Sequence, residues 1–352
     1  MSKNKLTMNQ KRNVARRVAR LCRDQENDIP EIQGDLGPVA EGTVVSRYGK
    51  AALVEDGTSR NLFRVYIRRT IDSIVTGDRV LFRPPLAGEE QAFGLVETVL
   101  PRTALLSRPD YYDGLRPVAA NISLIVAVSA RQPEFSTNII DRYVAAAEYS
   151  KIPALIVVNK YDLFQDGEKT DLDRILSVYR EIGYETMTVS AASGFGMDVL
   201  RERLSRETSI LAGQSGVGKS SILNVLIPEA RAETGAISDN SNLGQHTTTG
   251  SRLYHFENGG VIIDSPGVRE FALWHLSRED LTKCYREIAA VAGECRFRDC
   301  RHRDDPGCAV REAASQGKIA AFRYENYHRI LESMTENLPD AYRSPGKKNS
   351  RK

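Results

Sequence analysis

Short runs in which hydrophobic and polar residues alternate, each followed by a turn signal, fill residues 41–105. They read EGTVVSRYG, KAALVEDG, NLFRVYIRR, GDRVLFRPP and FGLVETVL. A period of two, rich in β-branched and aromatic residues, predicts strands with one buried face. Five such strands in so short a stretch favour a small barrel of the OB type.

Continuous apolar runs of strand length, separated by helical stretches, begin at residue 122. They read ISLIVAV, ALIVV, TMTVS, TSILAG and VIID. Uninterrupted apolar strands between helices predict a parallel sheet that helices cover on both faces. Residues 107–117, between the two patterns, contain two prolines and a glycine, and we interpret them as a linker.

The pattern becomes helical from Ser277. The sequence SRED has the form of a capping box, with Ser277 at the N-cap and Asp280 three residues later. Leu281, Cys284 and Ile288 then recur at helical spacing, so we expect the Cys284 side chain to be in a core. The whole pattern predicts a multidomain chain: a β-barrel, an α/β domain and a small helical domain.

Charge is unevenly distributed along the chain, although the net charge is only +3. Eight of the 49 Lys and Arg residues lie in residues 1–23 and five in residues 343–352, whereas all 46 acidic residues lie between these segments. We interpret the two ends as arms, unfolded when free, that bind nucleic-acid phosphates by releasing counterions. An organelle transit peptide is the alternative for the Arg-rich start.

Basic and aromatic residues also interleave within the predicted barrel. Such a surface binds phosphates and stacks on bases in nucleic-acid-binding proteins, although the aromatic residues could instead fill the barrel. The residues concerned are Arg47, Tyr48, Arg64, Tyr66, Arg68 and Arg69. No apolar run reaches about 18 residues and no signal-peptide core is present, so we expect a cytoplasmic protein without a membrane span.

The sequence GQSGVGKS at 213–220 fits the phosphate-loop pattern G-x-x-x-x-G-K-[ST]. It follows a predicted strand and precedes a predicted helix, which is the context that this motif requires. Backbone N–H groups and the helix N-terminus would surround phosphates, Lys219 would reach the β- and γ-phosphates, and Ser220 would hold Mg²⁺. The residues expected to contact the nucleotide here are Gly213, Gln214, Ser215, Gly216, Val217, Gly218, Lys219, Ser220 and Ser221.

Two further segments are typical of a γ-phosphate sensor. DSPG follows the strand VIID, so that Asp264 could supply a metal-linked carboxylate and Gly267 an N–H for the γ-phosphate. The sequence GQHTTTG at 244–250 offers hydroxyl groups for Mg²⁺ in a Gly-flanked loop.

The sequence NKYD at 159–162 follows the strand ALIVV and indicates a guanine site. An ionised Asp162 offers two acceptors to the adjacent N1–H and 2-amino donors of guanine, a pair that adenine lacks. Asn159 can hold the ring and the stem of Lys160 can cover its face. The residues expected at the base are Asn159, Lys160, Tyr161, Asp162, Ser190 and Ala191.

These motifs occur in an unusual order, because NKYD precedes the phosphate loop. After Ala191 comes GFGMDVLRERLSRE, the helix that usually ends such a domain, and it leads directly into TSILAG, the strand that usually begins it. Joining neighbouring termini and cutting elsewhere preserves a sheet. The order therefore predicts a circularly permuted P-loop GTPase domain.

The sequence CRFRDCRHRDDPGC predicts a metal site. Three thiolates and one imidazole form a closed tetrahedral set of the structural zinc type, with no position left for water. The alternative is a group of buried cysteines near a surface histidine. The expected ligands are Cys295, Cys300, His302 and Cys308.

Taken together, the barrel, the permuted motifs, GQHTTT and the Cys/His cluster resemble the RsgA (YjeQ) family of circularly permuted bacterial GTPases. The resemblance covers almost the whole chain and implies slow hydrolysis of GTP to GDP and phosphate, stimulated by the small ribosomal subunit. It also implies rRNA binding, a part in late subunit maturation and a part in the release of the assembly factor RbfA. It further implies a structural zinc, and Thr248 as the residue of the GQHTTTG loop that binds Mg²⁺. We expect a monomer.

One catalytic residue of Ras-like proteins is missing. They place a Gln directly after D-x-x-G to orient the attacking water, and Val268 stands at that position here. His246 is the nearest candidate to orient water, unless it only shapes its loop; Lys219 and Thr248 complete the expected catalytic set. An RNA-binding scaffold that guanine nucleotide orders, without important hydrolysis, remains the alternative function.

Five segments follow from these patterns. They are a basic N-terminal arm (1–36), an OB-fold RNA-binding domain (37–110), the permuted GTPase domain (111–276), a helical zinc-binding domain (277–342) and a basic C-terminal tail (343–352). Because the segment from Asp264 to Gly267 leads within about ten residues to Ser277, we expect loss of the γ-phosphate to alter how the helical domain docks.

Overall fold

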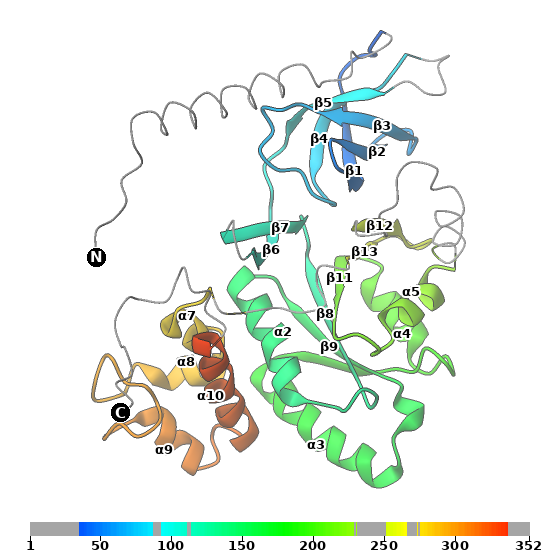
Figure 1. The fold of residues 1–352 in the computed structure, drawn as a ribbon. Coiled ribbons are helices and arrows are strands. Elements are labelled where there is room, and N and C mark those ends of the chain that lie inside the picture. Colours follow the sequence, from blue (N-terminus) through cyan, green and yellow to red (C-terminus); the bar gives the residue numbers. More distant parts are fainter. Residues whose placement is uncertain are drawn as a thin grey trace, which may run out of the picture.

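The computed structural model describes residues 35–86, 93–110, 114–228, 230, 251–265, 273 and 275–336. The predicted site residues His246, Thr248 and Gly267, and both basic ends, lie outside these residues. A barrel, an α/β domain and a helical region follow one another along the chain (Figure 1). None of the described helices combines the length and the apolar composition needed to cross a bilayer.

Five strands form the predicted barrel. They are β1 (Ala40–Tyr48), β2 (Ala51–Asp56), β3 (Leu62–Ile67), β4 (Arg79–Arg83) and β5 (Gly94–Val99). They pair in the order β1-β2-β3-β5-β4, and β4 closes the barrel by pairing with β1. Val54, Val65 and Phe82 are fully buried inside it. Tyr48 is exposed and the Tyr66 ring stacks on Phe93, so neither tyrosine belongs to the barrel core.

The stretch interpreted as a linker instead contains most of a β-hairpin. Strands β6 (Leu105–Asp110) and β7 (Gly114–Ala120) pair antiparallel. Pro109 and Pro117 fit because each strand of a two-stranded ribbon has a free edge, where a missing N–H breaks no ladder bond. The hairpin lies between the barrel and the α/β domain (Figure 1).

Six strands form the sheet of the α/β domain in the order β10-β9-β8-β11-β13-β12. They are β8 (Leu124–Ala130), β9 (Ala154–Asn159), β10 (Glu185–Thr188), β11 (Thr208–Ala212), β12 (Arg252–His255) and β13 (Val261–Asp264). The first five in this order are parallel, as predicted, and β12 is antiparallel to β13. The hydrophobic pattern did not predict β12, which also pairs with β1 at Arg252 and Ser46.

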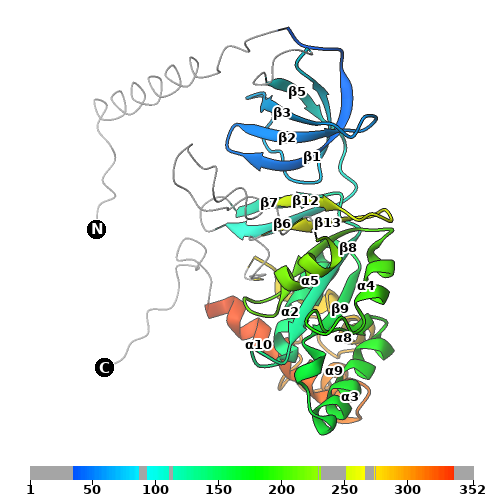
Figure 2. The same cartoon turned by 90° about the vertical axis from the view of Figure 1, so that its right-hand side faces the viewer.

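Helices cover both faces of this sheet, as Figures 1 and 2 show. They are α2 (Thr137–Ser150), α3 (Asp166–Ile182), α4 (Met197–Leu204) and α5 (Lys219–Leu226). The side chains of β9 alternate: Leu155 and Val157 pack with α4 and α5, whereas Ile156 and Val158 pack with α2 and α3. Helix α4 ends only a few residues before β11 begins, which confirms the permuted order.

In the described part of the C-terminal region, four helices follow one another. They are α7 (Arg278–Lys283), α8 (Arg286–Ala292), α9 (Ala309–Ser315) and α10 (Ala321–Glu336). Ser277 caps α7 as predicted, since its Oγ accepts a hydrogen bond of 3.0 Å from the N–H of Asp280. Cys284 is buried, as expected, at the break between α7 and α8. Helix α10 runs along α2 (Figure 1).

Candidate nucleotide site and metal centre

The predicted nucleotide residues follow the ends of four parallel strands. NKYD begins with the last residue of β9, Ser190 and Ala191 follow β10, the loop 213–218 follows β11, and Asp264 ends β13. Carboxyl ends of parallel strands meet at one edge of a sheet, which is where open α/β sheets bind ligands. The fold therefore brings the predicted base and phosphate segments to one edge.

The phosphate loop has a backbone that requires glycine. Gly216 and Gly218 have φ of +84° and +93°. A Cβ atom at Gly213 would lie 2.5 Å from the carbonyl oxygen of Val128. The Nζ of Lys219 donates to the carbonyls of Gly213 and Gln214 at 2.6 and 2.7 Å. The loop and the first turn of α5 can thus surround an anionic group with backbone N–H groups and a lysine.

NKYD is hydrogen-bonded to both neighbouring loops. The buried Asn159 donates through Nδ2 to the carbonyl of Val217 at 2.9 Å and accepts through Oδ1 from the N–H of Ala191 at 3.1 Å. The Nζ of Lys160 donates to the carbonyl of Gly216 at 2.7 Å and to that of Gln132 at 2.8 Å. Asn159 therefore connects the two loops, and its expected part in holding the ring stays a prediction.

The Asp162 carboxylate is exposed at this edge and accepts a hydrogen bond from the Ser190 hydroxyl. The Tyr161 ring stacks on Phe195, with centroids 5.3 Å apart and an interplanar angle of 17°. Phe195 was missed by the sequence analysis, because nothing in GFG distinguishes it from an ordinary loop residue. The stack joins the two loops that carry Asp162 and Ser190.

An ion pair connects the start of α3, the helix that follows NKYD, to the end of β8. The guanidinium of Arg131, just after β8, donates to both carboxylate oxygens of Glu168 at 2.9 and 2.8 Å. Glu168 also accepts from the N–H of Gln165 and completes the capping box of α3. The Arg131 hydrogen bond, followed by that of Gln165, lowers the pKa of Glu168 to about 2.

The four predicted zinc ligands lie together. Their donor atoms are all within 4.8 Å of one another. The Sγ atoms of Cys295 and Cys308 lie 3.5 and 3.7 Å from Nδ1 of His302. Bond lengths typical of zinc give a sulfur–nitrogen edge of about 3.6 Å in a regular tetrahedron. The donor set therefore fits a closed, four-coordinate metal site.

Local hydrogen bonds shape the loop that carries these ligands. Cys308 is the N-cap of α9, and its Sγ accepts from the N–H of Arg311 at 3.3 Å. The carbonyl of His302 accepts from the Tyr324 hydroxyl at 2.5 Å and lies 3.2 Å from Nε2 of His328, both on α10. Burial raises the pKa of the Cys300 thiol to about 12, so metal binding there would release a proton.

The family model described as RsgA GTPase matches residues 99–274. The chain is 50% identical over 340 residues to the small ribosomal subunit biogenesis GTPase RsgA of Actinobacillus pleuropneumoniae, covering 96% of this chain and 97% of that protein. It is 51% identical over 346 residues to the protein of the same name from Yersinia enterocolitica, with the same coverage of both chains.

Two solved structures are similar over nearly their full length. The crystal structure of YjeQ from Thermotoga maritima matches with a TM-score of 0.69 and 31% identity, covering 86% of this chain and 100% of that one. YloQ, described as a circularly permuted GTPase, matches with a TM-score of 0.64 and 25% identity, covering 88% and 99%.

Proposed function

Because this chain belongs to the RsgA GTPase family and is a GTP hydrolase, we propose that it acts on the small ribosomal subunit. It binds the subunit in the cytoplasm as a monomer and assists its late maturation, and hydrolysis times its own release and that of RbfA. The observation that carries this proposal is the likeness to subunit biogenesis GTPases over 96% of the chain.

Guanine is held at the edge formed by NKYD and the Ser190 loop. The exposed Asp162 carboxylate pairs with the N1–H and 2-amino groups, and the N–H at Ala191 lies beside the guanine oxygen. Asn159, Lys160 and the Tyr161–Phe195 stack hold the two loops in register. Specificity for guanine follows, because adenine cannot offer the two donors.

The phosphates lie in the loop 213–218, with Lys219 at the β- and γ-phosphates. Mg²⁺, when bound with GTP, supplies charge neutralisation, and Ser220, Thr248 and Asp264 are the residues proposed to hold it. Gly267 donates its N–H to the γ-phosphate and His246 orients water; the roles of Gly267, Thr248 and His246 rest on the sequence.

One zinc ion at the Cys295 cluster is proposed to be structural. The four protein donors fill a tetrahedral set and leave no position for a reacting water. The basic and aromatic side chains on the outside of the barrel, among them Arg47 and Tyr48, are proposed to contact rRNA. Metal analysis of the purified protein should give one zinc per chain.

Single-turnover hydrolysis of bound GTP, with purified small subunits, with large subunits and alone, tests the proposed function. We expect clear acceleration by small subunits only. Equal rates in all three conditions would favour the alternative, a nucleotide-ordered RNA-binding scaffold without important hydrolysis. His246→Ala should slow the accelerated rate while GTP binding is retained.

Asp162→Asn tests the guanine assignment. The amide presents a donor to guanine N–H groups, so GTP affinity should fall by several kcal/mol. XTP, whose 2-oxo group accepts from that amide, should bind the variant better than GTP does. The matched control is Asp166→Asn, an exposed acid at the start of α3. Unchanged GTP affinity in Asp162→Asn would contradict the assignment.

A further inference from the structure

A loop of the barrel, residues 71–78, packs against the α/β domain at the entry to β8 and at β13. Gly77 has φ of +88°, and a Cβ atom there would lie 2.3 Å from the carbonyl oxygen of Ala120 and 3.3 Å from Cδ1 of Ile263. The N–H of Ala120 donates to the carbonyl of Thr76 at 3.0 Å. The loop thus contacts both the entry to β8 and the residue of β13 that precedes Asp264.

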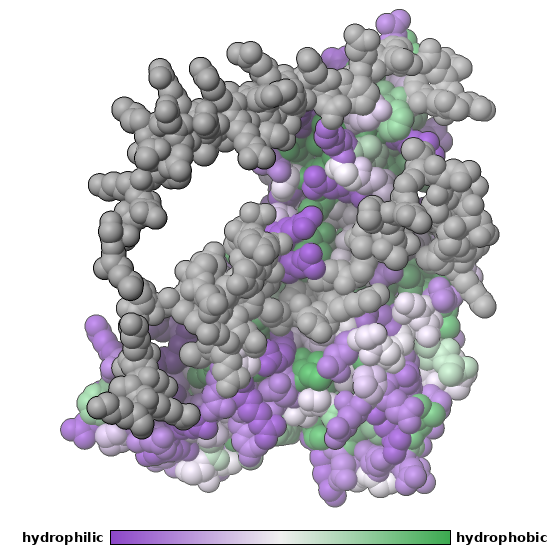
Figure 3. Space-filling view, in the orientation of Figure 1, coloured by the Kyte–Doolittle hydropathy of each residue, from purple (hydrophilic) through white to green (hydrophobic). Residues whose placement is uncertain are grey.

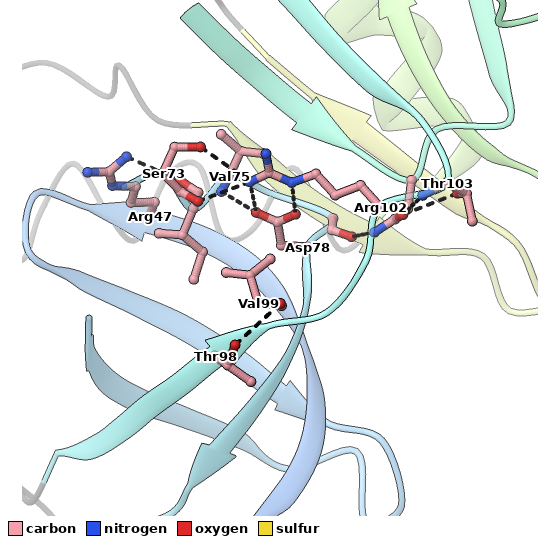
Figure 4. A network of polar contacts seen from close by, with 11 residues as sticks. Arg47, Ser73, Val75, Asp78, Thr98, Val99, Arg102 and Thr103 are labelled. Atoms are coloured by element: carbon pink, nitrogen blue, oxygen red, sulfur yellow. Dashed lines mark hydrogen bonds and ion pairs between the residues drawn. The ribbon is translucent and has the colours of Figure 1, made fainter. Parts of the chain in front are cut away.

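The same loop is held firmly to the barrel (Figure 4). The Asp78 carboxylate is fully buried and accepts from Nε and Nη2 of Arg102 at 2.7 and 2.8 Å. It also accepts from the N–H of Val75 at 2.8 Å, while Nη2 of Arg102 donates to the carbonyl of Ser73 at 3.0 Å. A loop fixed at so many points moves with the barrel.

The Thr76 hydroxyl extends this contact to the segments expected to sense the γ-phosphate. Thr76 Oγ1 donates to the carbonyl of Ser251 at 3.0 Å, and Ser251 Oγ lies 2.7 Å from Ser265 Oγ. Ser251 comes directly after the Thr-rich stretch 244–250, and Ser265 directly after Asp264. Three residues therefore connect the barrel to the ends of both segments.

Burial distinguishes this chain of contacts from incidental surface bonds. Thr76 and Ser265 are only 2% and 3% exposed. A valine has nearly the same shape as threonine and would fill this space without burying a hydroxyl group. The carbonyl that accepts from the Thr76 hydroxyl belongs to Ser251, 175 residues away in the sequence. The bond therefore crosses between domains at a site from which water is largely excluded, where a polar contact has more effect than at the surface.

We propose that Thr76 is a positioning residue for GTP hydrolysis, acting through Ser251 and Ser265. The position of the barrel fixes Ser251, which follows the Thr-rich segment, and Ser265, which follows Asp264. The inference rests on the proposed function: subunit RNA bound to the barrel fixes that placement, and the Thr76 bond transmits it to the site of hydrolysis.

Thr76→Val tests this proposal in the full-length protein. Single-turnover GTP hydrolysis at saturating small subunits should slow at least tenfold, whereas GDP affinity, subunit affinity and melting temperature should each stay close to wild type. Thr76→Ser, which keeps the hydroxyl, should restore at least half of the rate. The control is Thr98→Val, an exposed barrel threonine whose hydroxyl donates to the carbonyl of Val99 at 3.5 Å (Figure 4).

Ser251→Ala keeps the acceptor of Thr76 but removes the bond to Ser265, so it should also slow the stimulated rate. The double variant Thr76→Val, Ser251→Ala should be no slower than the slower single variant, because both interrupt one chain of contacts. Additive effects of the two substitutions would overturn this inference but leave the proposed function intact. A Thr76→Val protein that subunits stimulate as strongly as wild type would do the same. A wild-type protein that subunits do not stimulate would overturn the proposed function, and this inference with it.

Discussion

The helical region and the barrel both attach to the GTPase domain, but they do so in different ways. The helical region is joined to α2 by charges that are buried between helices. The barrel is joined by a loop, by one strand bridge and by side chains that remain partly exposed, and its contacts lie on the strands next to that edge.

The junction with the helical region centres on Arg323 of α10, which is fully buried. Its guanidinium donates to Asp141 of α2 at 2.5 Å and to Glu287 of α8 at 2.6 Å. The Tyr179 hydroxyl of α3 donates to Asp141 at 2.6 Å, and Asn326 of α10 donates to it at 2.8 Å. Burial raises the pKa of Asp141, while Arg323 and these donors oppose that rise.

The junction between the barrel and the GTPase domain contains fewer buried charges. Strands β1 and β12 pair at Ser46 and Arg252 alone. His255 on β12 lies 2.8 Å from the carboxylate of Glu55 on the barrel, and both side chains retain some exposure. Thr76 takes part in two buried hydrogen bonds, from its hydroxyl to the carbonyl of Ser251 and from the N–H of Ala120 to its own carbonyl. Because the partly exposed contact between His255 and Glu55 costs little to rearrange, whereas the charges around Arg323 are buried, we expect the barrel to shift with nucleotide state more readily than α10.

This difference changes the expectation drawn from the order of the chain. The short connection from Asp264 to Ser277 predicted that loss of the γ-phosphate alters the docking of the helical region. The buried ion pair of Arg323 with Asp141, and the half-buried Glu287 beside it, give that region a physical reason to stay docked. We therefore expect the main nucleotide response at the barrel junction.

Breaking the helical junction should have the largest effect on stability. Arg323→Met leaves Asp141 and Glu287 without their cation, and an uncompensated buried charge costs about 3–5 kcal/mol. Denaturant unfolding should show this loss. Arg329→Met, on the exposed face of the same helix, is the control and should change stability by no more than about 0.5 kcal/mol. Equal stability of the two variants would contradict the description of this junction.

Breaking the anchor of the barrel loop should cost less. Arg102→Met leaves the buried Asp78 carboxylate without its partner, but Arg102 is partly exposed, so water can replace part of the interaction. We expect a loss of about 2 kcal/mol in the unfolding of the barrel. Arg79→Met, which removes an exposed pair with Glu41, is the control. A loss as large as that of Arg323→Met would contradict the smaller effect expected from the partial exposure of Arg102.

The Arg131–Glu168 pair should give the smallest effect, visible through its pH dependence. The folded-state pKa of Glu168 is lowered from 4.5 to about 2, so its contribution is complete above about pH 4.5 and is lost as pH falls through about 2. Wild type should therefore exceed Glu168→Gln in stability at neutral pH, and the two should converge toward pH 2. Glu181→Gln, at the other end of α3, is the control substitution.

Much of the fold could be predicted because the patterns are strong and local. Alternation in residues 41–105 predicted the barrel, and continuous apolar runs predicted the parallel strands. Gly218, with φ of +93°, stands where the phosphate-loop motif places a glycine. The Cys and His spacing was enough to predict a cluster whose donors lie within 4.8 Å of one another.

The junctions could not be predicted, because their residues have no local signature. Arg323 lies in a helical pattern that looks amphipathic, and Thr76 in a polar turn. Their partners, Asp141 and Ser251, are 182 and 175 residues away in the sequence. Strand β12 has only four residues, too few for a periodicity to appear, and the hairpin at 105–120 was hidden by its prolines.

Hydrogen exchange of the free protein with GDP and with a non-hydrolysable GTP analogue tests most directly which junction responds to the nucleotide. Amides of the barrel loop, residues 71–78, should change their protection between the two states, whereas amides of α10 should exchange equally in both. A change in α10 with none in residues 71–78 would contradict the account and restore the helical region as the part that responds.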